Sequence, residues 1–106
     1  MTGTELDARI KLAADNLCLV AIHFPDSRRV SAPGWVDWVL IGARGVLFRE
    51  AKGDGDTLSG QQRALGYTLQ ANGLDWALWT PRDLRDLTIS RELEQIAARP
   101  KVRNGS

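Results

Sequence analysis

Three charged side chains, Asp37, Glu50 and Lys52, stand within or at the ends of two otherwise apolar, strand-like runs. Alternation along a strand places Glu50 and Lys52 on one face, so a carboxylate and an ammonium point the same way. Hairpin pairing of the two runs can bring Asp37 beside Glu50. Adjacent carboxylates repel each other unless a cation compensates them, and Mg²⁺ binds a few carboxylate and carbonyl oxygens together with several waters. The pattern therefore favours a metal site suited to phosphodiester hydrolysis, with Lys52 near a metal-bound water or a substrate phosphate.

The same charges also have an ordinary explanation. Glu50 and Lys52 can form the solvated end of an edge strand, where lysine is a common protection against pairing with another sheet. An isolated E-x-K pattern favours that explanation, whereas Asp37 in the preceding strand-like run keeps a metal site open. The spacing alone does not decide between the two.

The elements that must position these residues are indicated by hydrophobic periodicity and by turn residues. Their order is α-β-β-β-α-β-α, which predicts an α/β or α+β domain whose mixed sheet is covered by helices. The expected elements are a helix at 4–17 with Thr4 as its N-cap, a buried strand at 18–24, strands at 35–42 and 45–52 joined at Ala43 and Arg44, a helix at 59–72, a strand at 74–80, and one helix or two from Pro81 to Arg99.

Composition sets the limits of the interpretation. With 106 residues the chain has room for one domain, which we expect at 1–98, followed by a mobile basic tail at 99–106. The net charge of +1 does not by itself indicate a nucleic-acid binder. No apolar run approaches the roughly 20 residues of a membrane span, and the single cysteine, Cys18, excludes an internal disulfide. A reducing, cytoplasmic location without membrane association is the simplest expectation.

A series of short motifs runs through most of the chain in a fixed order. The motifs are Thr4-Glu5, His23 with Asp26-Ser27-Arg28-Arg29, Gly34 with Asp37, Glu50 with Lys52, Leu58-Ser59 with Gln62, and Trp79 with Pro81 and Asp83. With these motifs, the sequence from about Thr4 to Leu87 resembles the small stand-alone members of the VRR-NUC family, a branch of the PD-(D/E)xK nuclease superfamily common in phages and bacteria. Two positions depart from the family pattern, because Val36 replaces a proline and Gly60 stands where a better helix starter is usual.

The resemblance implies a fold and a set of roles. The fold would be a restriction-endonuclease-like core, a central mixed sheet flanked by helices in the order α-β-β-β-α-β, with an extra C-terminal helix. The cofactor would be Mg²⁺ or Mn²⁺. The resemblance assigns Asp37, Glu50 and the backbone carbonyl of Ala51 to the metal, Lys52 to the attacking water, and Gln62 and Glu5 to the lining of the same pocket.

The activity implied by the resemblance is that of a metal-dependent DNA endonuclease in the cytoplasm of a bacterium, encoded by the host or by a phage. Selectivity for branched, junction or flap DNA is a further expectation, and one active site per chain would require a homodimer to cut two strands together. The alternative on the same fold is a nucleic-acid-binding or regulatory protein that has lost cleavage. DNA contacts are predicted for Arg28 and Arg29, which can bind phosphates in a bidentate manner, and for His23 and Ser27, which also have ordinary structural explanations.

Overall fold

The computed structural model describes residues 1–25 and 31–98, so the predicted contacts of Ser27, Arg28 and Arg29 and the predicted tail at 99–106 lie outside the described residues. Within them the elements follow the predicted order, and the last predicted helix is divided in two. The elements are α1 (Gly3–Asn16), β1 (Val20–His23), β2 (Trp38–Gly42), β3 (Gly45–Ala51), α2 (Gly60–Ala71), β4 (Asp75–Trp79), α3 (Pro81–Arg85) and α4 (Thr88–Ile96).

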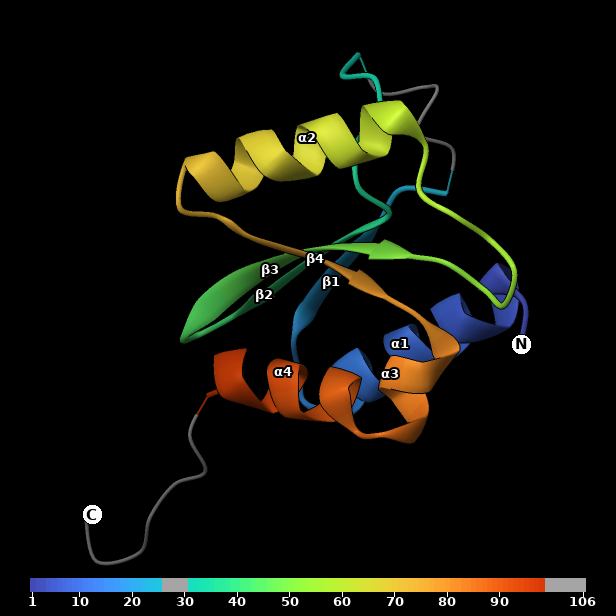
Figure 1. The fold of residues 1–106 in the computed structure, drawn as a ribbon. Helices are drawn as coiled ribbons and strands as arrows, with labels where there is room; N and C mark the ends of the chain where they lie inside the picture. The colour runs from blue at the N-terminus through green and yellow to red at the C-terminus, as the bar shows by residue number, and fades with distance from the viewer. Residues whose placement is uncertain (26–30, 99–106) are drawn as a thin grey trace, which may run out of the picture.

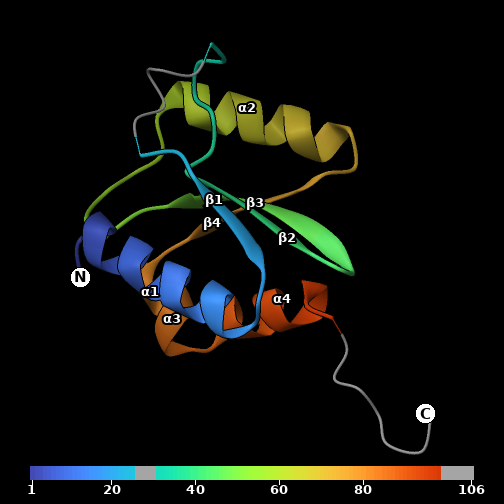
Figure 2. The same cartoon turned by 180° about the vertical axis from the view of Figure 1, so that it is seen from behind.

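The four strands form one mixed sheet in the order β1-β2-β3-β4. Strands β1, β2 and β3 pair antiparallel, whereas β4 pairs parallel to β3. Gly42 lies opposite Gly45, so Ala43 and Arg44 form the two-residue turn of the predicted hairpin. Helix α2 lies on one face of the sheet, and α1, α3 and α4 lie together on the other (Figures 1 and 2). The expected α/β arrangement, a mixed sheet flanked by helices, is therefore confirmed.

Each face of the sheet has its own apolar core. Trp38 and Trp79 are buried with the apolar sides of α1 and α4, whereas Trp35 and Trp76 pack on the side of α2. Alternation predicts the opposite placement of Trp35 and Trp38. On the α2 side the helix approaches very closely, because a Cβ on Gly66 would lie 2.3 Å from the Trp76 ring. The sheet is thus held from both sides, with its ends left for polar residues.

Two expectations about the start of the chain were wrong. Thr2, not Thr4, caps α1: its hydroxyl accepts a hydrogen bond from the Glu5 N–H, and the Glu5 carboxylate accepts one from the Thr2 N–H, both at 3.1 Å. Strand β1 is mostly exposed rather than buried, with Val20 56% exposed. The reason is its position, since β1 is an outer strand of the sheet and, within the part of the chain that the structure describes, it pairs with β2 alone.

The C-terminal helical segment breaks at Leu87. This residue adopts a left-handed backbone conformation with φ of 68°, uncommon for a residue that is not glycine, and its side chain is exposed. The Asp86 carboxylate accepts a hydrogen bond from the Thr88 N–H at 3.0 Å, which starts α4 in a new direction. The break therefore divides the helical segment that starts at Pro81 into α3 and α4, which is one of the two arrangements expected from the sequence.

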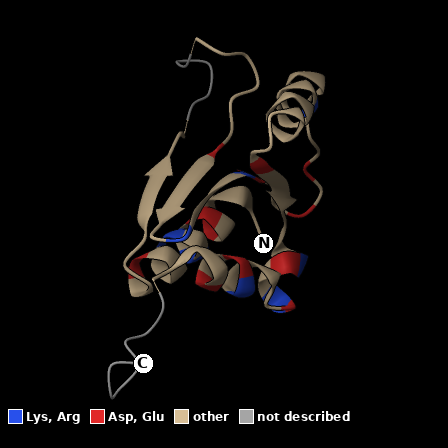
Figure 3. Ribbon diagram, turned by 90° about the vertical axis from the view of Figure 1, so that its left-hand side faces the viewer, with Lys and Arg blue, Asp and Glu red and all other residues tan. Residues whose placement is uncertain are grey.

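Charged side chains are unevenly distributed over these layers. Most of those in the described residues lie on the helices α1, α3 and α4 and at the ends of strands (Figure 3), and β1 and β2 contain no Lys, Arg, Asp or Glu. No helix in the described part of the chain has the length and apolar character needed to span a membrane. The charges at the strand ends are consequently the ones that call for an explanation.

Candidate active site

The start of β2 and the end of β3 bring the two predicted carboxylates together. Trp38 pairs with Arg49 in the antiparallel ladder, so Asp37 and Glu50 are the next residues outward on the two sides. The Ala51 backbone N–H donates a hydrogen bond to Oδ2 of Asp37 at 2.8 Å. This bond fixes the Asp37 carboxylate against β3, directly beside the position of Glu50.

Glu50 is in an unusual environment for a glutamate. It is 0% exposed, and it lies on the face of the sheet covered by α2. Its Oε1 accepts a long hydrogen bond of 3.5 Å from Nε2 of Gln62, and its Oε2 has no hydrogen-bond partner among the described residues. A buried polar atom without a partner is unfavourable, and a buried charge without one is more so. Glu50 therefore requires either a proton or a bound cation.

The electrostatics of the pair agree with this requirement. Burial raises the pKa of Glu50 to about 8, and the neighbouring Asp37 raises it as well, while the Lys52 ammonium acts in the opposite direction. Burial likewise raises the pKa of Asp37, whereas the Ala51 N–H and Lys52 lower it. Both shifts favour the retention of a proton by the pair when no metal is bound. A divalent cation would displace that proton.

Lys52 follows the last residue of β3 and is half-buried. Its backbone N–H donates to the Trp79 carbonyl at 3.0 Å, which continues the contact between β3 and β4 by one residue. Its ammonium is near enough to both Asp37 and Glu50 to lower the pKa of each. The structure therefore brings the predicted lysine to the two predicted carboxylates.

Gln62 joins the site from the first turn of α2. It forms a capping box with Ser59, in which the Ser59 N–H donates to Oε1 of Gln62 at 3.0 Å and the Gln62 N–H donates to the Ser59 hydroxyl at 3.1 Å. Because the amide oxygen is bound to Ser59, the amide NH₂ group is the part that faces Glu50. The cap of the helix thereby sets the orientation of a side chain in the site.

The acidic residues of α1 are arranged differently from the expectation. Glu5 is exposed, and its carboxylate is engaged in the capping box with Thr2. Asp7, which was not predicted as a site residue, acts on the site instead. Burial is the largest influence on the pKa of Asp37 and raises it, and the Ala51 N–H and Lys52 lower it. The negative charge of Asp7 is the next influence, and it raises the pKa of Asp37. Asp7 stands three residues before the buried Ile10, at the border of the apolar stripe of α1. This position is the sequence feature that could have indicated its place near the site.

The residues of the predicted DNA contact are described only in part. His23 ends β1 and lies opposite Trp38 in the ladder, one residue from Asp37 along β2. The Phe24 N–H donates to the Asp37 carbonyl at 2.7 Å, which ties the end of β1 to the site. Ser27, Arg28 and Arg29 lie outside the described residues.

The two departures from the family pattern are accommodated in the fold. Val36 is fully buried in the core on the α2 side, and Asp37 still makes its hydrogen bond to β3. Gly60 is the first residue of α2, and a Cβ added there would meet open space. Gly34 is constrained more strongly, because its φ is +76° and a Cβ would lie 2.3 Å from the Gln61 carbonyl oxygen. The loop before Asp37 is thus seated directly on the start of α2.

The donor set fits a hard, oxygen-preferring cation. Among the described residues no group of three or more His, Cys, Asp or Glu side chains is arranged to hold a metal ion. Two carboxylates and the neighbouring Ala51 carbonyl are nevertheless enough for Mg²⁺ or Mn²⁺, since Mg²⁺ commonly keeps several waters. The unpartnered Oε2 of Glu50 is the atom that most needs such a ligand.

Comparisons of the chain with protein families, with curated proteins and with solved structures found no match. The assignment of a function consequently depends on the geometry of Asp37, Glu50, Lys52 and Gln62 and on the resemblance carried by the motifs. The geometry of these four residues is an observation that does not depend on the resemblance.

Proposed function

We propose that this protein is a Mg²⁺- or Mn²⁺-dependent endonuclease that hydrolyses phosphodiester bonds in DNA. The observation that carries the proposal is Glu50, a fully buried carboxylate beside Asp37 with one oxygen that has no partner among the described residues. A residue of this kind destabilises the folded protein unless it has a ligand, and strongly perturbed carboxyl groups concentrate at functional sites.

Each residue of the site has a role that its contacts support. Asp37, Glu50 and the Ala51 carbonyl would hold the metal, which supplies a Lewis acid and a more acidic bound water. The Lys52 ammonium, near both carboxylates, is suited to stabilise negative charge that develops on a phosphate and to orient the attacking water. Gln62 holds the Glu50 carboxyl group in place through its amide N–H.

The architecture supports the same proposal. The order α-β-β-β-α-β, followed by further helix, agrees with the order that the resemblance implies. The proposed metal ligands lie where β2 starts and β3 ends, at one end of the two central strands of the sheet. The proposal further includes a location in the bacterial cytoplasm, branched, junction or flap DNA as the substrate, and two copies of the chain acting together on a junction.

Metal-dependent cleavage is the direct test. Linear, flapped and branched DNA would be incubated with the protein and Mg²⁺ or Mn²⁺, alongside Glu50→Ala and Lys52→Ala. Each substitution should reduce the rate by about 100-fold or more, as expected when a group that stabilises developing charge is removed. Glu94→Ala, an exposed glutamate on α4, serves as the matched control and should cleave like the wild type.

The opposite outcomes are equally clear. DNA binding without metal-dependent cleavage of any substrate would exclude the enzyme and leave a nucleic-acid-binding protein. Cleavage that survives both substitutions would indicate a contaminating nuclease. Calorimetric titration with Mn²⁺ provides a second measurement, since Asp37→Ala should abolish the binding heat while Glu94→Ala should preserve it.

A further inference from the structure

Asp7, His23 and Trp38 form a polar cluster next to the proposed active site. Oδ1 of Asp7 accepts a hydrogen bond from the Trp38 indole N–H at 2.8 Å. Oδ2 of the same carboxylate lies 3.4 Å from Nε2 of His23. The His23 ring stacks on the Trp38 ring, with centroids 4.2 Å apart and an interplanar angle of 14°. One carboxylate therefore accepts a hydrogen bond from the indole and lies close to the imidazole, and the two rings pack on each other.

The cluster is fixed on its inner side and open on its outer side. Trp38 is 1% exposed and belongs to the core on the α1 side. The side chains of His23 and Asp7, by contrast, are 33% and 27% exposed. Trp38 is the immediate neighbour of Asp37, so the imidazole is held at the rim of the site on the opposite face of the sheet from Glu50.

The chemistry of the pair suits an anionic partner. A carboxylate at one ring nitrogen fixes the orientation of an imidazole and leaves the other nitrogen for an outside group. With Nε2 directed to Asp7, Nδ1 is the nitrogen that has no hydrogen-bond partner among the described residues. The doubly protonated ring has two N–H donors, and a phosphate offers only acceptors. A DNA strand that crosses the Asp37–Glu50 site would bring phosphates to this rim.

We infer that Asp7 is a positioning residue, which holds His23 so that the imidazole binds a backbone phosphate of DNA beside the proposed active site. The inference rests on the proposed nuclease function for its ligand. It replaces Glu5 by Asp7 as the acidic residue of α1 that serves the site, because Glu5 is engaged with Thr2.

The test measures binding of the full chain to a short labelled DNA duplex in EDTA, so that no cleavage occurs. A series of duplexes carries one uncharged methylphosphonate in place of one phosphate at a time. Wild type should lose about five- to tenfold in affinity when the contacted phosphate is replaced, the size expected for one hydrogen bond. His23→Ala should bind unmodified DNA more weakly by a similar factor and lose nothing further from that replacement.

The DNA affinity of Asp7→Asn should likewise become insensitive to replacement of the same phosphate by methylphosphonate. The asparagine oxygen still accepts the Trp38 N–H, so the fold is kept, but it offers no charge to His23. Asp15→Asn is the matched control, because Asp15 is an exposed carboxylate of the same helix paired with Lys11 at 2.6 Å. This control should remain as sensitive as the wild type.

Two results would overturn the inference. One is that His23→Ala and Asp7→Asn stay as sensitive as the wild type at every phosphate, which is the result expected of a purely structural cluster. The other is that the wild type does not bind DNA. Because binding in EDTA is separate from cleavage, a protein that binds but never cleaves would refute the nuclease while the same series still decides the phosphate contact.

Discussion

Arg49 and Glu50 are adjacent on β3, and both are charged and almost completely buried, at 2% and 0% exposure. They point to opposite faces of the sheet, Arg49 towards α4 and Glu50 towards α2. Arg49 is surrounded by partners, whereas Glu50 has one long hydrogen bond and one oxygen without a partner among the described residues. Two neighbours with the same burial thus have very different polar surroundings.

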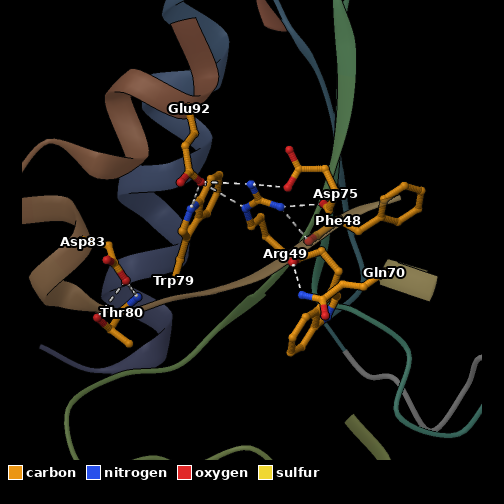
Figure 4. Close-up of polar contacts among 9 residues, drawn as sticks. Phe48, Arg49, Gln70, Asp75, Trp79, Thr80, Asp83 and Glu92 are labelled. Carbon is orange, nitrogen blue, oxygen red and sulfur yellow. Dashed lines mark hydrogen bonds and ion pairs between the residues drawn. The ribbon is translucent and has the colours of Figure 1, made fainter. Parts of the chain in front are cut away.

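The partners of Arg49 tie three elements together (Figure 4). Its guanidinium donates to Oε1 of Glu92 at 3.2 and 3.0 Å and to the Asp75 carbonyl at 2.6 Å. It also lies 5.3 Å from the centre of the Trp79 ring, whose indole N–H donates to the same Glu92 oxygen at 2.8 Å. This network joins β3, β4 and α4 and accounts for the buried charge through the fold alone.

The contrast separates a buried charge that the fold fully explains from one that it does not. Where every polar atom of a buried ion has a partner, packing and hydrogen bonding are a sufficient explanation. Where an oxygen is left without one, as in Glu50, the missing partner has to be a retained proton or a bound cation, and the neighbouring Asp37 favours either of these. Burial alone would have put Arg49 and Glu50 in the same class.

Breaking the Arg49 network should have the largest effect. Arg49→Met leaves Glu92 without its main partner and should lower the free energy of unfolding by about 3 kcal/mol, towards the lower end for a broken buried pair because Glu92 is partly exposed. Urea denaturation measures the change. Arg63→Met, at an exposed position on α2, should change it by less than about 0.5 kcal/mol. Equal effects of the two substitutions would refute the structural assignment of Arg49.

The pH dependence of stability should reveal the opposite character of Glu50. Its pKa is about 8 in the folded protein against an ordinary value of 4.5, so between these values the folded state binds more protons than the unfolded state. The contribution of this group to the free energy of unfolding is therefore fully present below pH 4.5. It is lost as the pH rises towards 8, by at most about 1.4 kcal/mol per pH unit. The free energy of unfolding of Glu50→Gln should therefore increase relative to that of the wild type as the pH rises, as measured by urea unfolding across this range. A difference that does not change with pH would contradict the prediction.

Metal should remove the penalty that Glu50 imposes. A cation that binds the ionised pair stabilises the folded protein by about 1.4 kcal/mol at ten times its Kd. Thermal unfolding at pH 8 should accordingly shift upward with Mg²⁺ or Mn²⁺ in the wild type and stay unchanged in Glu50→Gln. An equal shift in both proteins would place the cation elsewhere.

The cap of α2 offers a smaller and more local change. Ser59→Ala removes the hydroxyl that accepts the Gln62 N–H and should lower the free energy of unfolding by about 1 kcal/mol. Thr2→Ala, at the corresponding cap of α1, should have a similar effect on stability. If Gln62 is oriented by its cap, only Ser59→Ala should also reduce metal-dependent cleavage per folded molecule. Equal activity of the two variants would show that the cap does not influence the site.

Much of this arrangement could be predicted from local patterns. Alternation and the hairpin turn at Ala43 and Arg44 place Asp37 beside Glu50, because both signals act over a few residues. The network of Arg49 could not be predicted, since its partner Glu92 lies 43 residues away on a helix that packs on the far face. Asp7 was missed for the same reason, as its role depends on how α1 meets β1 and β2.

The two wrong expectations about the start of the chain had different causes. The spacing of Thr2 and Glu5 is that of a capping box, and it identifies both the true start of α1 and the partner of the Glu5 carboxylate. The exposure of β1 depends on sheet order, which the strand pattern does not contain. Local rules therefore found the carboxylate pair and Lys52, and long-range packing decided what surrounds them.

The left-handed Leu87 between α3 and α4 also has a practical consequence for engineering the chain. A residue with a Cβ is strained there by about 1–2 kcal/mol, and a glycine is not, although glycine gives back part of that gain through the greater entropy of the unfolded chain. Because the Leu87 side chain is 59% exposed, its removal gives up little packing. Leu87→Gly is thus a candidate for a more heat-tolerant parent, in which destabilising variants of Arg49 could be produced and assayed.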